Sequence, residues 1–272
     1  MTSLDADAPT YAAIDDLTVE LADGVLSVTL NRPDSLNSLT KDMLDGVGEV
    51  LETAASDKRV KVVRLAGAGR GFCSGAGISD DDQDQKTANG PASVLDAANR
   101  AVRSIVNLPQ PVVAAVHGPA AGVGVSLALA ADVVLASDDA YFMLAFTKIG
   151  LMPDGGASAL VAAAIGRIRA TRMALLAERI SATEAYDWGL VTAMYPAAEF
   201  DAGVAKVIDT LKNGPAVALR RTKHAINAAT LTEIEPALER EREGQLSLLT
   251  SPDFIEGITA FQQRRPAKFS DF

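Results

Sequence analysis

The stretch Pro111–Ser137, PVVAAVHGPAAGVGVSLALAADVVLAS, decides the fold of this chain. It opens with Val112–Val116 (VVAAV), a short apolar run of the kind found in strands that are buried on both faces. The tripeptide HGP then turns the chain into Gly122–Ala131, which predicts an apolar helix, and Val133–Ala136 predicts a further strand. Strand, glycine-rich turn, helix and strand in this order predict a layered α/β core.

The same order of elements recurs upstream of this stretch. Gly24–Asn31 and Val60–Ala66 alternate apolar and polar side chains, as half-buried strands do. Thr40–Ala55 carries apolar residues at helical spacing, and Ser93–Leu108 predicts a second helix that two following prolines end. The repetition strengthens the prediction of an α/β core.

The pattern changes beyond about residue 200, where no strand signal remains. The helices predicted there are Val204–Leu211, Ala216–Ala229 and Leu231–Leu249. We therefore predict a mixed α/β core over residues 1–198 and an all-helical region over residues 199–272.

Composition narrows the possible functions. The 272 residues include 35 acidic and 25 basic side chains, and this net charge of −10 argues against general nucleic-acid binding. The single cysteine, Cys73, leaves no internal disulfide framework and fits a reducing compartment. The first residues do not resemble a secretory signal, and the apolar stretch Pro119–Ala131 is too short to span a bilayer. We expect a cytoplasmic protein with neither nucleic-acid nor membrane partners.

Two glycine-rich turns are candidates for an active site. Ser74–Gly77 (SGAG) and Gly122–Gly124 (GVG) each follow an apolar strand, and the second leads into a helix. Glycine lets backbone N–H groups point out of a turn, and two converging donors would form an oxyanion hole. Taken alone, the same glycines are equally typical of a strand packed tightly on a helix. Neither turn matches a Walker or dinucleotide-binding motif.

Six blocks of sequence carry a resemblance to a known family. They are Asn31–Leu39 (NRPDSLNSL), Val62–Ile78 (VVRLAGAGRGFCSGAGI), Pro111–Ser137, Lys148–Ser158 (KIGLMPDGGAS), Arg179–Val191 (RISATEAYDWGLV) and Phe261–Phe269 (FQQRRPAKF). In order and spacing they resemble the enoyl-CoA hydratase/isomerase (crotonase) superfamily. The resemblance implies a spiral of repeated ββα units with a C-terminal helical region that forms homotrimers or dimers of trimers. It also implies an acyl-CoA thioester substrate, with coenzyme A as part of that substrate and no separate cofactor.

The resemblance also implies a set of site residues. The backbone N–H groups of Ala76 and Val123 would form the oxyanion hole, although the family usually has glycine where this chain has Val123. Removal of a proton beside a thioester makes an enolate, whose charge two fixed donors would stabilise. The further positions that would bind the substrate are Leu36, Ser74, Gly77, Ile78, Gly122, Ser126, Ala145, Phe146 and Lys268.

Family hydratases add water to a 2-enoyl-CoA with two glutamates, and both are absent here. Ser126 stands four residues after Gly122, where the first glutamate is expected. Phe146 stands four residues before Gly150, where the second is expected. Neither side chain can act as a carboxylic acid or base. The sequence therefore disfavours ordinary hydration, and Phe146 is compatible with an aromatic or bulky acyl group.

One carboxylate remains near the expected site. Asp154, in the segment PDGG, matches the position at which certain enoyl-CoA isomerases and 4-chlorobenzoyl-CoA dehalogenase use an aspartate as base or nucleophile. The alternative is structural, because this aspartate could N-cap the helix predicted near Ala157–Ile165. A dehalogenase would need a histidine in the loop after the first glycine turn, and Ser79–Asp96 contains none.

The combined prediction is an enoyl-CoA isomerase that removes and returns a proton with Asp154 as the catalytic residue. The first alternative is an enoyl-CoA hydratase that uses a rearranged set of residues. The second is a non-catalytic acyl-CoA-binding protein that kept the oxyanion donors and lost the chemistry.

The remaining polar candidates favour structural roles. His117 is expected to be a hydrogen-bonded turn residue, His224 a surface residue, and Cys73 a small buried residue rather than a nucleophile. Two distant histidines and one cysteine predict no zinc site, and Asp80–Asp82 lacks the spacing of a calcium loop. The positive patch that suits the phosphates of coenzyme A comprises Arg264, Arg265 and Lys268.

Overall fold

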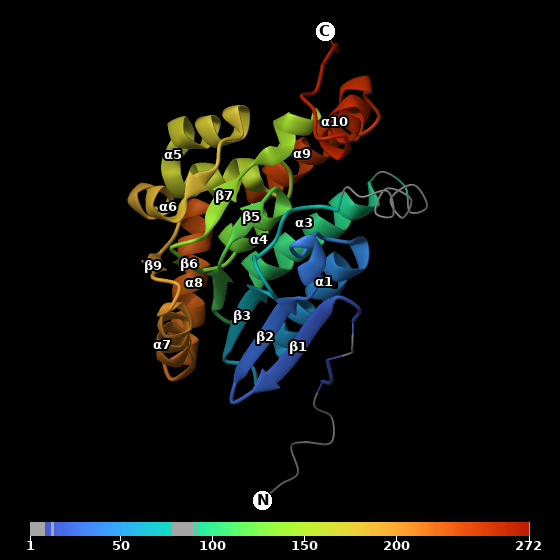
Figure 1. The fold of residues 1–272 in the computed structure, drawn as a ribbon. Helices are drawn as coiled ribbons and strands as arrows, with labels where there is room; N and C mark the ends of the chain where they lie inside the picture. Colours follow the sequence, from blue (N-terminus) through green and yellow to red (C-terminus); the bar gives the residue numbers. More distant parts are fainter. Residues whose placement is uncertain (1–8, 12–13, 78–89, 91, 272) are drawn as a thin grey trace, which may run out of the picture.

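The computed structural model describes residues 9–11, 14–77, 90 and 92–271 (Figure 1). Its strands form a six-stranded sheet in the order β1-β2-β3-β4-β6-β9 and a three-stranded sheet in the order β5-β7-β8. The strands are β1 (Leu17–Ala22), β2 (Val25–Leu30), β3 (Val62–Gly67), β4 (Val112–Val116), β5 (Pro119–Ala121), β6 (Val133–Ser137), β7 (Tyr141–Met143), β8 (Ile180–Ser181) and β9 (Ala193–Tyr195). The helices are α1 (Lys41–Ser56), α3 (Ser93–Asn107), α4 (Val123–Leu129), α5 (Ala157–Leu176), α6 (Ala182–Trp188), α7 (Phe200–Lys212), α8 (Ala216–Thr230), α9 (Ile234–Leu248) and α10 (Pro252–Gln262). Two short 3-10 helices are η1 (Pro33–Ser35) and η2 (Ala145–Ile149).

The larger sheet is parallel from β2 to β9, and only β1 runs antiparallel to its neighbour. In the register of these strands, Val25 lies opposite Val62 and Val113 lies opposite Val133. Parallel neighbours need a crossover connection, which α1, α3 and α4 supply between successive strands. The α/β class predicted from the sequence is confirmed.

Helices cover both faces of the larger sheet. On one face, Val63 and Leu65 of β3 join the main apolar core, to which α1, α3, α4 and α5 contribute. On the other face, Val62 and Ala66 of the same strand pack against α7. Burial on both faces explains why these strands read as nearly continuous apolar runs.

The C-terminal helices pack directly on this core. Ile234 and Leu238 of α9 belong to the main apolar cluster, and α10 packs against η2. Lys223 of α8 is buried with its Nζ 2.8 Å from Asp132 Oδ2. Burial lowers the pKa of Lys223 and raises the pKa of Asp132. The last strand is β9 and helices follow, while the division of the chain near residue 198 stays a prediction.

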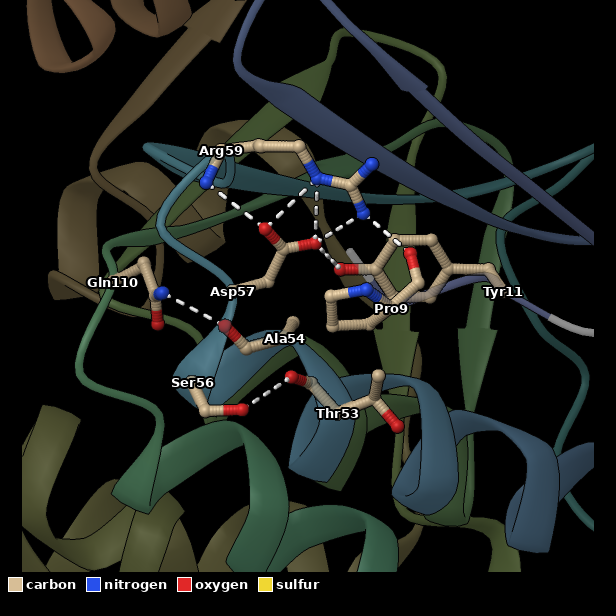
Figure 2. Close-up of polar contacts among 8 residues, drawn as sticks. All are labelled: Pro9, Tyr11, Thr53, Ala54, Ser56, Asp57, Arg59 and Gln110. Carbon is tan, nitrogen blue, oxygen red and sulfur yellow. Dashed lines mark hydrogen bonds and ion pairs between the residues drawn. The ribbon is translucent and has the colours of Figure 1, made fainter. Parts of the chain in front are cut away.

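A network of polar side chains lies at the edge of the sheet where β3 and β4 begin (Figure 2). The buried carboxylate of Asp57, just after α1, accepts hydrogen bonds from the Tyr11 hydroxyl at 3.1 Å and from Arg59 Nε at 3.0 Å. The Arg59 guanidinium holds the pKa of Asp57 below its usual value. Beside them, Gln110 Nε2 donates to the Ala54 carbonyl at 2.8 Å. The glycine-rich turns lie at the opposite edge, where the same strands end.

Candidate active site

The structure brings the two glycine-rich turns together beyond the carboxyl ends of β3 and β4. Cys73 N donates to Pro119 O at 2.9 Å and Ala121 N donates to Cys73 O at 2.8 Å, in a short parallel pairing. The turns approach so closely that a Cβ on Gly75 would lie 3.0 Å from Ala121 O. Open parallel sheets bind ligands at this edge.

Glycine is required at two positions of the second turn. Gly122 has φ 54° and ψ −129°, a conformation that residues with a side chain rarely adopt. A Cβ on Gly124 would lie 2.8 Å from both the Cβ and the carbonyl oxygen of Cys73. Helix α4 therefore begins in direct contact with the first turn.

The amide of Ala76 is left out of the local backbone pairing. Leu39 N donates to Gly75 O at 2.8 Å and Gly77 N donates to Leu39 O at 3.0 Å. These bonds use the groups on either side of Ala76, whose own N–H has no acceptor within the part of the chain that the structure describes. Ala76 itself is half-buried.

The amide of Val123 is the first of α4, and a first helical N–H has no partner within its helix. Among the described residues it donates to no acceptor outside the helix either. The Val123 side chain is buried, and its Cγ1 lies 3.7 Å from the position that a Cβ on Gly155 would occupy. The valine that replaces the usual glycine of the family is therefore accommodated between α4 and the turn that contains Gly155.

Asp154 lies in this same turn and is buried, with 8% of its surface exposed. Its Oδ2 accepts a hydrogen bond from Gln245 Nε2 at 2.7 Å. Its backbone carbonyl accepts from the Ser126 hydroxyl at 2.9 Å and from Ala157 N at 3.2 Å. The turn is thus fixed against α4 on one side and α9 on the other.

The alternative that Asp154 caps the following helix is wrong. The N-cap residue of α5 is Gly156, and no side chain of its own segment caps the helix. Instead Glu241 of α9 accepts from Gly156 N at 2.6 Å and from Ser158 N at 2.8 Å. Burial raises the pKa of Glu241, and the hydrogen bonds from Ser158 and Gly156 oppose this rise.

The two positions at which family hydratases carry glutamates have packing roles here. Ser126 is fully buried, and its hydroxyl donates to the Asp154 carbonyl. Phe146 in η2 is 7% exposed, and its Cζ lies 3.7 Å from the position that a Cβ on Gly122 would occupy. The phenyl ring therefore lies against the second glycine turn, as a side chain that lines the acyl site would.

The other predicted substrate-binding residues are spread over three segments. Ser74 N donates to Leu36 O at 2.9 Å, so that the loop after β2 lines the first turn, and Ala145 opens η2 beside Phe146. Lys268 is exposed on the segment after α10, with its backbone N bonded to Glu256 Oε1 at 2.8 Å. Ile78 and Asp80–Asp82 lie outside the described residues.

The positive patch predicted near the C-terminus is partly neutralised. Arg265 forms an ion pair with Glu256 at 2.6 Å, and this guanidinium lowers the pKa of Glu256 to about 2. Arg264, Arg265 and Lys268 are all exposed, and the role of this patch toward the phosphates of coenzyme A stays a prediction.

The polar residues expected to have structural roles do so. His117 Nε2 lies 3.0 Å from the Gly69 carbonyl, and His224 is exposed on α8. Cys73 is fully buried, which raises the pKa of its thiol to about 12 and disfavours the reactive thiolate. Over residues 9–11, 14–77, 90 and 92–271, no group of three or more potential ligand side chains could hold a metal ion.

The sequence analysis missed Glu241 and Gln245, both of which reach the Asp154 turn from α9. Their partners lie more than 80 residues earlier in the chain, so no local motif reveals them. A signal does exist in the helix itself, because the two residues continue the buried stripe of Ile234, Ala237 and Leu238. A glutamate and a glutamine on the apolar side of a helix indicate polar partners in the core.

Comparison with known proteins identifies the class: the chain belongs to the enoyl-CoA hydratase/isomerase family, whose model matches residues 20–271. It is 36% identical over 252 residues to the 1,2-epoxyphenylacetyl-CoA isomerase of Escherichia coli K12, covering 91% of this chain and 95% of that protein. It is 30% identical over 254 residues to the 2,3-dehydroadipyl-CoA hydratase of the same organism, covering 93% and 98%.

A solved structure matches the fold closely. The crystal structure of an enoyl-CoA hydratase from Mycobacterium avium subsp. paratuberculosis K-10 is 64% identical, with a TM-score of 0.89 over 95% of this chain and 100% of that one. The predicted family and crotonase-type fold are confirmed, and the protein is an enzyme that acts on acyl-CoA thioesters. No helix in the described part of the chain is both long and apolar enough to cross a bilayer.

Proposed function

We propose that this enzyme is an enoyl-CoA isomerase with Asp154 as its acid–base residue. The observation that carries the proposal is the buried carboxylate of Asp154, whose turn packs against α4, while Ser126 and Phe146 occupy the two glutamate positions of the hydratases. Isomerisation needs one group that removes a proton and returns it. Hydration must also activate a water molecule, for which family hydratases use two carboxylates.

In the proposed reaction, the Asp154 carboxylate removes a proton from C2 of a 3-enoyl-CoA. The electron pair of that C–H bond forms the enolate, whose charge moves to the thioester oxygen. The N–H groups of Ala76 and Val123 donate to this oxygen, and one such donor contributes about 3 kcal/mol to the transition state. Protonated Asp154 then returns the proton to C4, and the double bond moves from C3–C4 to C2–C3.

The relatives support two candidate reactions. The E. coli relative named 1,2-epoxyphenylacetyl-CoA isomerase supports isomerisation, and the ring-bearing acyl group in its name is compatible with Phe146 beside the second glycine turn. The relative named 2,3-dehydroadipyl-CoA hydratase supports hydration by a rearranged set of residues as the second candidate.

We also infer a cytoplasmic homotrimer or dimer of trimers, which needs no cofactor beyond the coenzyme A of its substrate. Exposed apolar side chains on the C-terminal helices support subunit contacts there. They are Val217, Ile226, Ile255 and Phe261. Light scattering of the purified protein would test the subunit number.

The test supplies 2-enoyl-CoA and 3-enoyl-CoA to the purified enzyme and separates the products by chromatography. Asp154→Asn should lower interconversion about 10²- to 10⁴-fold. Asp138→Asn is the matched control, because Asp138 is exposed and its Oδ1 accepts a hydrogen bond from a backbone amide, that of Ala197. Wild-type activity in Asp154→Asn would refute the assignment of the base. If the hydrated product is the only product, the result would favour the hydratase. If the protein binds acyl-CoA without turnover, the result would favour the non-catalytic alternative.

A further inference from the structure

Two polar side chains of α9 reach the turn that contains Asp154. Glu241 and Gln245 are four residues apart and lie on the same face of the helix, and each is 1% exposed. Glu241 holds the backbone of the turn through the amides of Gly156 and Ser158. Gln245 contacts the Asp154 carboxylate itself.

The orientation of the Gln245 amide is fixed by its two partners. Nε2 donates to Asp154 Oδ2 at 2.7 Å, while Oε1 accepts from Met152 N at 3.2 Å. Reversing the amide would set an oxygen against the carboxylate and an NH₂ group against the backbone N–H. Gln245 is therefore a donor to the carboxylate.

We propose that Gln245 is a positioning residue that keeps Asp154 oriented and deprotonated for proton removal. The proposal rests on the proposed function of Asp154 as the base. A hydrogen bond donated to a carboxylate favours its charged form, whereas burial and a nearby negative charge disfavour it. Asp154 is buried, and the Glu241 carboxylate is bonded to Gly156 N two residues further along the same turn, so the donor from Gln245 opposes both effects.

In the described part of the chain, the polar groups that neighbouring helices present near Asp154 have other partners. From α4 the contacting side chain is Ser126, whose hydroxyl donates to the Asp154 backbone carbonyl rather than to its carboxylate. The first turn of α5 has no titratable side chain. On α9, Arg242 is paired with Asp96 of α3 at 2.7 Å, so that its charge faces that helix.

The experiment compares the pH dependence of kcat in Gln245→Leu and Gln245→Glu. Without the donor, the carboxylate takes up a proton at higher pH, so the acid limb should move up by about one pH unit or more in Gln245→Leu. Gln245→Glu keeps the size of the side chain and an acceptor for Met152 N. It adds a like charge, so its acid limb should move at least as far.

Gln110 offers a matched control at the opposite edge of the sheet (Figure 2). It is also a buried glutamine, 7% exposed, and its Nε2 donates to the Ala54 carbonyl at 2.8 Å. Gln110→Leu and Gln110→Glu should lower the midpoint of thermal unfolding without moving the acid limb.

An unmoved acid limb in a folded Gln245→Glu enzyme would overturn the proposal, as would an equal shift in the Gln110 variants. If Gln245→Leu does not fold, Gln245→Glu decides. If neither variant folds, Gln245→Asn is used, because its shorter amide cannot reach both Asp154 and Met152. The acid limb of Gln245→Asn should move up, and an unmoved limb would overturn the proposal. Asp154→Asn separates the role of Asp154 from that of Gln245. If Asp154→Asn is active, the assignment of Asp154 as the base fails. If Asp154→Asn is inactive but the acid limb of the Gln245 variants stays in place, only the role of Gln245 fails.

Discussion

Replacing Gly124 by alanine tests whether the spacing of the two glycine turns governs catalysis. The new Cβ would lie 2.8 Å from the Cβ and carbonyl oxygen of Cys73 and 2.9 Å from its Sγ. Ordinary contact begins at 3.4 Å, so α4 and the first turn must separate by about 0.6 Å. Cys73 cannot yield easily, because its N and O are bonded to Pro119 and Ala121.

Overpacking of this kind destabilises a protein by about 1–3 kcal/mol. The effect on rate should be larger, because a misplacement on the order of 1 Å in a catalytic site lowers the rate roughly 100-fold. The proposed oxyanion donors are the amides of Ala76 and Val123, one on each turn. We therefore expect kcat/KM to fall between about 10- and 100-fold in Gly124→Ala, mainly through kcat.

The assay combines thermal unfolding with steady-state kinetics on 3-enoyl-CoA, at a temperature where the variant is folded. Gly48→Ala in α1 is the matched control. A Cβ there would meet the Arg100 side chain at 3.2 Å, and this side chain is flexible and can move aside. A folded Gly124→Ala enzyme with kcat/KM within about threefold of wild type would refute the link between turn spacing and activity.

Two further predictions concern stability. Lys223→Met removes the cation that lies 2.8 Å from Asp132, whose side chain is 19% exposed, so the free energy of unfolding in urea should fall by about 1–3 kcal/mol, and adding Asp132→Asn should recover part of the loss. A Lys223→Met protein as stable as wild type would contradict this prediction. Asp57→Asn should lower the free energy of unfolding at pH 7 by about 1 kcal/mol. Because the Arg59 guanidinium lowers the pKa of Asp57, this contribution is present above the unfolded-state pKa of about 4 and is lost as pH falls through the folded-state value. The difference in the free energy of unfolding between Asp57→Asn and wild type should therefore shrink in acid. An unchanged difference at low pH would contradict this prediction.

Periodicity predicted the main elements because they are long and regular. The helix expected over Thr40–Ala55 is α1, with Thr40 as its N-cap, and the apolar run Val112–Val116 is β4. The sequence did not predict β1, β9 or the three-stranded sheet of β5, β7 and β8. These last strands have two or three residues each, too few for a period of two to stand out.

The candidate site, like the fold, has one part that the sequence predicts and one part that it does not. The two glycine turns carry a local signal, since glycine is needed where φ is positive or where two backbones touch. The environment of Asp154 carries none, because its partner Gln245 is 91 residues away in sequence. The capping alternative failed for this reason: Glu241 reaches the start of α5 from α9, and local turn chemistry cannot reveal a cap that comes from a distant helix.

The packing of the two substituted positions bears on which reaction this site suits. A glutamate at position 126 would press on the Asp154 turn, because Ser126 is fully buried and its hydroxyl already lies 2.9 Å from the Asp154 carbonyl. The Phe146 ring likewise fills the space beside Gly122. Restoring the glutamate at position 126 would therefore displace the turn that holds Asp154 before it could create a second acid–base pair. A single carboxylate suffices when the proton that it removes is the proton that it returns, so this packing favours isomerisation over hydration.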